Sequence, residues 1–233
     1  MRVRILVVLA AAMVMSVIST DALDREGLIA LAAESWSQAQ AEAAIQRAQG
    51  SDPELVALVT GIVRHNLAVK DPGHWAEAAI AALEPCAHGN DAVGLGYYGS
   101  ALTLRARLAS QKGDLIGATM GVQQGWAKLD DALKAAPDSL LLRFLRAENV
   151  ISVGQSSPFK RWKVAEADLD RITGAQATLS LDERAHLELL RGRLALAKGD
   201  TNEGMRRMEA AIRMAPNSTA AADAKAALAD YEE

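Results

Sequence analysis

Three stretches of the sequence share one pattern: Thr103-Leu104-Arg105-Ala106-Arg107-Leu108, Phe144-Leu145-Arg146-Ala147-Glu148-Asn149 and Leu189-Leu190-Arg191-Gly192-Arg193-Leu194. Each contains Leu-Arg followed by a small residue, and a glycine stands seven residues after that small residue. A weaker fourth copy places Gly61 at the small position. The small residues therefore stand at positions 61, 106, 147 and 192, with spacings of 45, 41 and 45 residues. A repeat of this length is typical of stacked two-helix units.

The small residue and the glycine each have a physical role in such a unit. A small side chain in the first helix allows the second helix to approach it closely. The glycine two turns later ends the first helix, because glycine adopts the left-handed conformation of a helix terminus without steric cost. The second helix then returns antiparallel to the first. Prolines follow it in several units, at Pro85, Pro137 and Pro216.

The composition favours helices along the whole chain. Alanine accounts for 47 of the 233 residues, and only 4% of the residues are aromatic. Alanine is the strongest helix former and is poor in strands. Capping residues and helix breakers predict eleven helices, at residues 23–33, 36–49, 53–69, 73–83, 91–112, 114–136, 138–153, 159–173, 182–198, 200–215 and 218–231.

The last repeat unit resembles the tetratricopeptide repeat (TPR) family most closely. Its small, turn, large apolar and terminal-proline positions are Gly192, Gly199-Asp200, Met208, Ala211 and Pro216. An earlier unit matches similarly at Leu129, Ala132 and Pro137. The resemblance covers residues 53–217, but one unit lacks the turn glycine, another lacks the proline, and Arg105, Arg146 and Arg191 replace the usual leucine. The chain therefore resembles a degenerate, TPR-like member of the family.

The resemblance implies an all-α fold, namely a right-handed α-solenoid of antiparallel helix pairs with a concave groove. We expect four to five units, at residues 53–85, 91–137, 138–173 and 182–216, followed by a C-terminal capping helix at 218–231. No Ser/Gly-rich or charged linker interrupts residues 23–233, so we expect them to form a single domain. The resemblance implies no catalysis.

The N-terminus has the pattern of an export signal. Arg2 and Arg4 precede an apolar run of 14 residues, from Ile5 to Ile18, and small residues follow it. A membrane-spanning helix needs about 20 residues, whereas the core of a secretory signal needs about 7–15. Residues 1–22 are therefore predicted to be a cleaved signal peptide, which directs the protein to a periplasm or out of the cell. An uncleaved segment that tethers the protein to the membrane is the alternative; after cleavage no membrane insertion is expected.

Charge and cysteine content exclude several kinds of site. The net charge of −4 argues against binding nucleic acid through a basic surface. Cys86 is the only cysteine, so the chain can form neither an intramolecular disulfide nor a Cys-rich zinc cluster. His74 and His88 stand near Cys86, but a fourth ligand at suitable spacing is missing. We therefore predict no metal site.

Other motifs also have structural interpretations. Residues 94–99 match the glycine pattern of dinucleotide-binding loops, but a loop precedes them where that motif requires a strand. We therefore predict no cofactor and no catalytic residue. The carboxylates of Asp130, Asp131, Asp168 and Asp170 have the spacing of solvated helix faces.

Candidate partner-binding residues follow from the repeat. In TPR proteins the residue after the small position tends to face the groove, which here gives Ile62, Arg107, Glu148 and Arg193. Of these, Arg107 and Arg193 are the best groove candidates. Ser100, Phe144 and His186 should lie on the same side by helical spacing, with Leu189 as an apolar contact. The repeated Arg105, Arg146 and Arg191 have two interpretations: stems lying on the solenoid surface, or a ladder of cations that binds an acidic partner.

These observations favour an exported, non-enzymatic scaffold that binds a protein or peptide of the cell envelope in its concave groove. A small-molecule-binding accessory of an envelope transport system is the alternative, and an undetected enzyme is a remote one. The sequence does not identify the partner or the oligomeric state.

Overall fold

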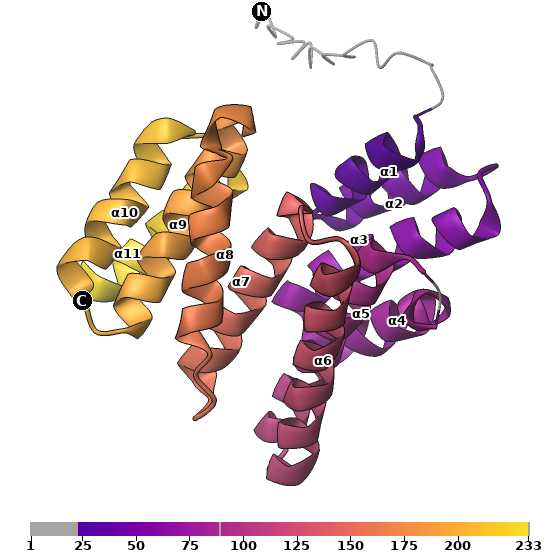
Figure 1. Cartoon of the computed structure of the whole chain (residues 1–233), viewed down its shortest axis with the longest axis horizontal. Helices are drawn as coiled ribbons and strands as arrows, with labels where there is room; N and C mark the ends of the chain where they lie inside the picture. The colour runs from indigo at the N-terminus through magenta and orange to yellow at the C-terminus, as the bar shows by residue number, and fades with distance from the viewer. Residues whose placement is uncertain (1–22, 89, 233) are drawn as a thin grey trace, which may run out of the picture.

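The structure, a computed structural model, describes residues 23–88 and 90–232, so the predicted signal peptide lies outside the described residues. Within this part the chain forms eleven α-helices and one short 3₁₀ helix (Figure 1). They are α1 (Arg25–Ala33), α2 (Gln38–Ala48), α3 (Pro53–Lys70), α4 (Pro72–Ala87), α5 (Ala92–Gln111), α6 (Leu115–Ala135), α7 (Leu140–Ser156), α8 (Trp162–Gly174), η1 (Gln176–Thr178), α9 (Leu181–Ala197), α10 (Thr201–Met214) and α11 (Thr219–Glu232). The all-α prediction is confirmed.

Side-chain caps explain where most of these helices begin. An aspartate or serine before the helix accepts a hydrogen bond from a backbone N–H of the first turn, as Asp91 does before α5 and Asp114 does before α6. Ser180 forms a reciprocal capping box with Glu183 at the start of α9. At the other end, Gly113 and Gly199 have φ angles of 83° and 90°, which confirms that they end α5 and α9.

Two predicted breakers lie inside helices instead. Pro85 was expected to end a helix at residue 83, but α4 continues to Ala87; Pro85 lies in its last turn, so only the two residues after it follow the disturbed position. Gly154 lies within α7, where its role is close packing: a Cβ at this position would overlap the ring of Trp162. Glycine at this position allows α8 to pack closely and does not form a turn.

The helices pack as successive hairpins. The pairs are α3–α4, α5–α6, α7–α8 and α9–α10, and each first helix also contacts the first helix of the next pair. Helices α1 and α2 pack on α3, while α11 covers α9 and α10 at the other end. The predicted small positions are confirmed as close contacts, because a Cβ on Gly61 would overlap Leu83 and one on Gly192 would lie 3.0 Å from the Gly204 carbonyl oxygen.

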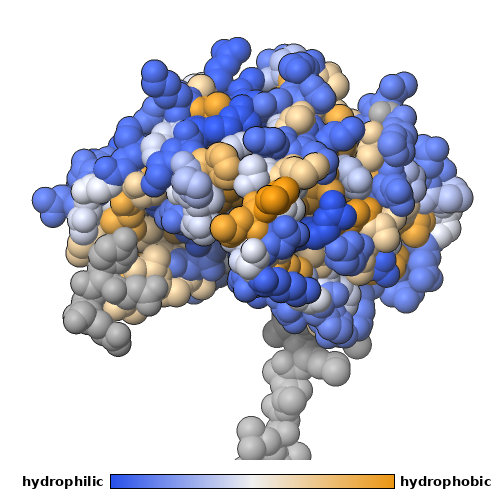
Figure 2. All heavy atoms as spheres, turned by 90° about the horizontal axis from the view of Figure 1, so that it is seen from below, coloured by the Kyte–Doolittle hydropathy of each residue, from blue (hydrophilic) through white to orange (hydrophobic). Residues whose placement is uncertain are grey.

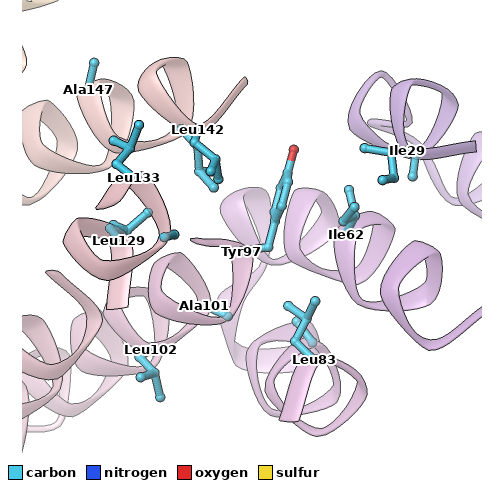
Figure 3. Packing of buried hydrophobic residues seen from close by; sticks show 14 of the residues in the cluster. Ile29, Ile62, Leu83, Tyr97, Ala101, Leu102, Leu129, Leu133, Leu142 and Ala147 are labelled. Carbon is cyan, nitrogen blue, oxygen red and sulfur yellow. The ribbon is translucent and has the colours of Figure 1, made fainter. Parts of the chain in front are cut away.

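Apolar side chains from many helices join in one core. The ring of Tyr97 on α5 stands between Ile62 on α3 and Leu142 on α7, so it links three successive first helices (Figure 3). A second cluster at the C-terminal end contains Leu189, Met208 and Ala224, from α9, α10 and α11. Hydrophilic residues cover most of the face shown in Figure 2, with apolar residues in smaller patches between them. The α-solenoid arrangement therefore buries most of the apolar surface and positions the faces of α3, α5, α7 and α9 next to one another.

Candidate functional site

A cavity of about 320 Å³ with a mixed polar and apolar lining lies where the first helices of all four pairs meet. We call it the central cavity. Helices α3, α5, α7 and α9 all contribute to its lining. The polar and charged groups that line it include His65, Ser100, Thr103, Arg107, Glu148, Asn149 and Arg193. The repeat therefore brings residues from four separate units to one site.

The structure places three of the six predicted groove residues in this cavity. Arg107, Arg193 and Ser100 line it. Phe144 and His186 lie beside it on α7 and α9, with their rings packed against each other at 5.3 Å between centroids. The prediction for Leu189 is wrong: this residue is 2% exposed, because it belongs to the apolar cluster that α9 forms with α10 and α11.

A hydrogen-bonded network of buried side chains forms one wall of the cavity. The Nε2 atom of His65 lies 2.8 Å from the Ser100 Oγ atom. The Asn149 side-chain amide donates to the same oxygen at 3.1 Å and to the Thr103 hydroxyl at 2.6 Å. The Trp126 indole in turn donates to the Asn149 side-chain oxygen at 3.0 Å. These bonds tie α3, α5, α6 and α7 together, and because they connect distant residues the sequence did not reveal them.

Burial keeps His65 neutral. Desolvation lowers the pKa of its imidazole from 6.5 to about 4, although a hydrogen bond with Asn66 acts in the opposite direction. The Asn66 amide nitrogen already donates to the carbonyl oxygens of Ala32, Ala33 and Ser35. Its side-chain oxygen therefore accepts from His65 Nδ1–H, and the Nε2 atom accepts from the Ser100 hydroxyl.

Ser100, His65 and Asn66 are hydrogen-bonded in a row, as the nucleophile, the base and the orienting group of a catalytic triad are. A base with a pKa near 4 removes a proton only weakly at neutral pH, and Ser100 is just 4% exposed. The hydroxyl also accepts the hydrogen bond from Asn149. These features support a structural role for the group.

The pH dependence of stability should therefore carry a contribution from His65. Because the pKa is about 4 in the fold and 6.5 when unfolded, protons bind preferentially to the unfolded chain. The stabilisation is complete above pH 6.5 and should be lost as the pH falls towards 4, by roughly 3 kcal/mol. Urea unfolding of wild type and His65→Gln across this range measures the effect. Their stability difference should shrink with falling pH, whereas parallel curves would contradict the neutral buried imidazole.

Arg107 is held in the cavity without a carboxylate. Its Nη2 atom donates to the Val69 carbonyl oxygen at the end of α3, at 3.0 Å. Its Nε atom is buried and has no hydrogen-bond partner in the described part of the chain. Burial lowers the pKa of this guanidinium, and among the described residues no carboxylate offsets that effect.

Arg193, by contrast, is neutralised by two carboxylates. Its guanidinium lies 3.5 Å from Glu148 on α7 and 3.0 Å from Asp223 on α11. Glu148 is also 3.7 Å from the Nε2 atom of His186. Arg193 therefore helps to hold α7, α9 and α11 together.

The three repeated arginines bind to other helices of the same chain. Arg146 contacts the Asp168 carboxylate at 2.7 and 2.8 Å, and these bonds outweigh the opposing effect of burial and raise the pKa of the guanidinium. Arg191 binds Asp170 at 2.8 Å, and Arg105 lies 4.0 Å from Glu77. Since Arg146 and Arg191 already bind carboxylates of the same chain, the three arginines do not form a ladder of free cations.

The prediction that Asp168 belongs to a solvated helix face is also wrong, since this residue is completely buried. Arg143 contacts it as well, at 3.0 Å. The second carboxylate of this group, Asp130, accepts from Arg146 at 2.8 Å and from Arg161 at 2.9 Å. Three arginines and two aspartates thus connect α6, α7 and α8.

The remaining sequence motifs serve packing. Gly94, Gly96 and Gly99 all lie inside α5, where they allow close contacts with Cys86, Leu142 and α6. Cys86 itself is 7% exposed, and burial raises the pKa of its thiol. The described residues contain no group of three potential metal ligands, and none of the described helices is long and apolar enough to cross a membrane.

Comparisons with known proteins identify the fold. Neither the known family models nor the curated proteins contain a match to this sequence. The structure is similar to the crystal structure of a thermophilic TPR protein from Thermus thermophilus, with a TM-score of 0.61 and 16% sequence identity. The match covers 88% of this chain and 99% of that one. The chain is thus an all-helical, TPR-like repeat protein.

Proposed function

We propose that this protein is an exported, non-enzymatic scaffold that binds a protein or peptide of the cell envelope on the face formed by α3, α5, α7 and α9. TPR-like folds in general support protein interactions, because stacked helix pairs present an extended concave surface. The main support for the proposal is the central cavity on this shared face. Polar groups from all four helix pairs line it and are available to a ligand.

Export rests on the sequence of residues 1–22 and has its own test. The mass of the intact protein recovered from the periplasm should be smaller than that of the full chain by the mass of about 19–22 residues. Full-length protein in the membrane fraction would instead indicate a tether. Full-length protein in the cytosol would contradict export.

In-cell photo-crosslinking tests the binding face. Ser152 and Gln155 line the cavity and are exposed, so a photoreactive amino acid at either position should leave the fold intact. Gln123 on α6 and Lys163 on α8 are exposed residues outside the cavity and serve as matched controls. We expect one defined protein adduct from the two cavity positions and none from the controls. Adducts from the control positions alone would contradict the proposed binding face.

A small-molecule-binding accessory of an envelope transport system is the second candidate, and the cavity volume favours it. At about 320 Å³ the central cavity is near the lower end of the range of small-molecule sites. In that case the cavity positions would give no protein adduct. Native mass spectrometry of protein purified from its own compartment would then show a bound low-mass compound.

A further inference from the structure

The central cavity contains one arginine, Arg107, that has no carboxylate partner in the described part of the protein. Three ionised side chains line it: Arg107, Glu148 and Arg193. Glu148 and Arg193 pair with each other, and His65 is neutral at physiological pH because its pKa is about 4. Arg107 differs from Arg193, because its only hydrogen-bond acceptor in the described part of the chain is the uncharged Val69 carbonyl.

The guanidinium of Arg107 has hydrogen-bonding capacity that the described part of the chain does not use. A buried donor that lacks a partner costs about 1–3 kcal/mol, and more when it belongs to a charged group. The buried Nε atom of Arg107 is such a donor. The other arginines around this face differ, since Arg146 and Arg193 each contact two carboxylates. An anion beside Arg107 would compensate its charge as those carboxylates do.

Helix α7 supplies further hydrogen-bonding groups to the lining of the cavity. Ser152, Gln155 and Ser156 lie on α7, line the cavity and are exposed. Their hydroxyl and amide groups can donate to the remaining lone pairs of an oxyanion. Leu104 and Val69 add apolar surface on the Arg107 side. The lining is thus suited to an anionic group attached to a small apolar stem.

We propose that Arg107 anchors an anion-binding subsite in the central cavity, which takes a carboxylate or phosphate group. The group belongs to an acidic residue of the bound partner or to a small organic anion. This inference rests on the proposed function, because it assumes that the cavity face is the binding surface. It replaces the idea of two equivalent groove arginines, since Arg193 is occupied by Glu148 and Asp223.

The test observes Arg107 directly in the intact mature protein. Its side-chain Nε–H resonance is followed by NMR while sodium acetate, succinate or phosphate replaces sodium chloride at constant ionic strength. A short alanine peptide with blocked ends, carrying one glutamate, forms a second arm, with the corresponding glutamine peptide as its control. We expect a saturable shift of the Arg107 resonance with the anions and with the glutamate peptide, but not with the glutamine peptide or chloride.

Two variants assign the shift to Arg107 itself. The backbone amides of Ser152 and Gln155 report binding in Arg107→Gln, where affinity should fall by roughly tenfold or more, the loss expected for a charged hydrogen bond. Arg105→Gln removes a more exposed arginine of the same helix and should leave affinity unchanged. Tighter binding of the glutamate peptide would identify a protein segment as the source, and tighter binding of succinate or phosphate a small anion.

Failure of the subsite can be distinguished from failure of the proposed function. If no anion gives a saturable shift of the Arg107 resonance, or if Arg107→Gln binds as well as wild type, the subsite is refuted. A defined partner adduct at Ser152 in the same protein would then leave the scaffold function standing.

Discussion

Replacing Gly125 by leucine is expected to destabilise the protein by at least about 3 kcal/mol. Gly125 on α6 lies against the backbone of α5, and a Cβ at this position would be 2.5 Å from the Gly99 carbonyl oxygen and 2.6 Å from Thr103. Helices α5 and α6 cannot move apart to make room for the side chain without losing the other contacts between them. For a domain of this size the thermal midpoint should fall by roughly 6–12 °C, measurable by circular dichroism.

A second glycine provides the control for this substitution. Gly174 ends α8, has open space at its Cβ position and does not have a positive φ angle. Gly174→Leu should change stability by less than about 1 kcal/mol. Equal losses in the two variants would show that α5 and α6 are not in close contact.

The second large effect is expected for Asp168→Ala, with a loss of about 3–5 kcal/mol. Asp168 is completely buried, while the side chains of Arg143 and Arg146, which bind it, are 14% and 16% exposed. Removing the carboxylate leaves the poorly solvated Arg143 guanidinium without a counter-charge and leaves Arg146 with Asp130 alone. Chemical denaturation of the variant measures the loss.

Asp170 provides the control for this substitution, because it carries the same charge as Asp168 but is exposed. Asp170 lies on the same helix and binds Arg191 at 2.8 Å, but its side chain is 73% exposed. Asp170→Ala should cost less than about 1 kcal/mol, since exposed ion pairs contribute little. If the Asp168 variant lost no more than the Asp170 variant, the buried arginine–aspartate group would not hold α7 and α8 together.

The features that sequence alone predicted are those set by local backbone chemistry. The left-handed turns at Gly113 and Gly199 follow from one residue type at a fixed distance from the small position. The close contact at Gly192 follows from the same repeat. Helix number and approximate boundaries followed from caps and breakers, and they were wrong mainly where packing decided the outcome, as at Gly154 beside Trp162.

The candidate site could not be predicted from the repeat pattern alone. His65, Ser100 and Asn149 belong to three different units, so only the packing of α3, α5 and α7 reveals their hydrogen bonds. The burial of Asp168 depends on arginines 22 and 25 residues away. Leu189 was misplaced because helical spacing aligns it with Arg193, whereas its side chain belongs to the apolar cluster shared by α9, α10 and α11.

Hydrogen–deuterium exchange of the mature protein, with and without the partner recovered by crosslinking at Ser152, tests the central claim most directly. If the face of α3, α5, α7 and α9 binds the partner, exchange should slow in these four helices, most strongly in the segments around Arg107 and Ser152. The second helices α4, α6, α8 and α10 should change little. Slower exchange confined to those second helices would contradict the claim that the cavity face is the binding surface.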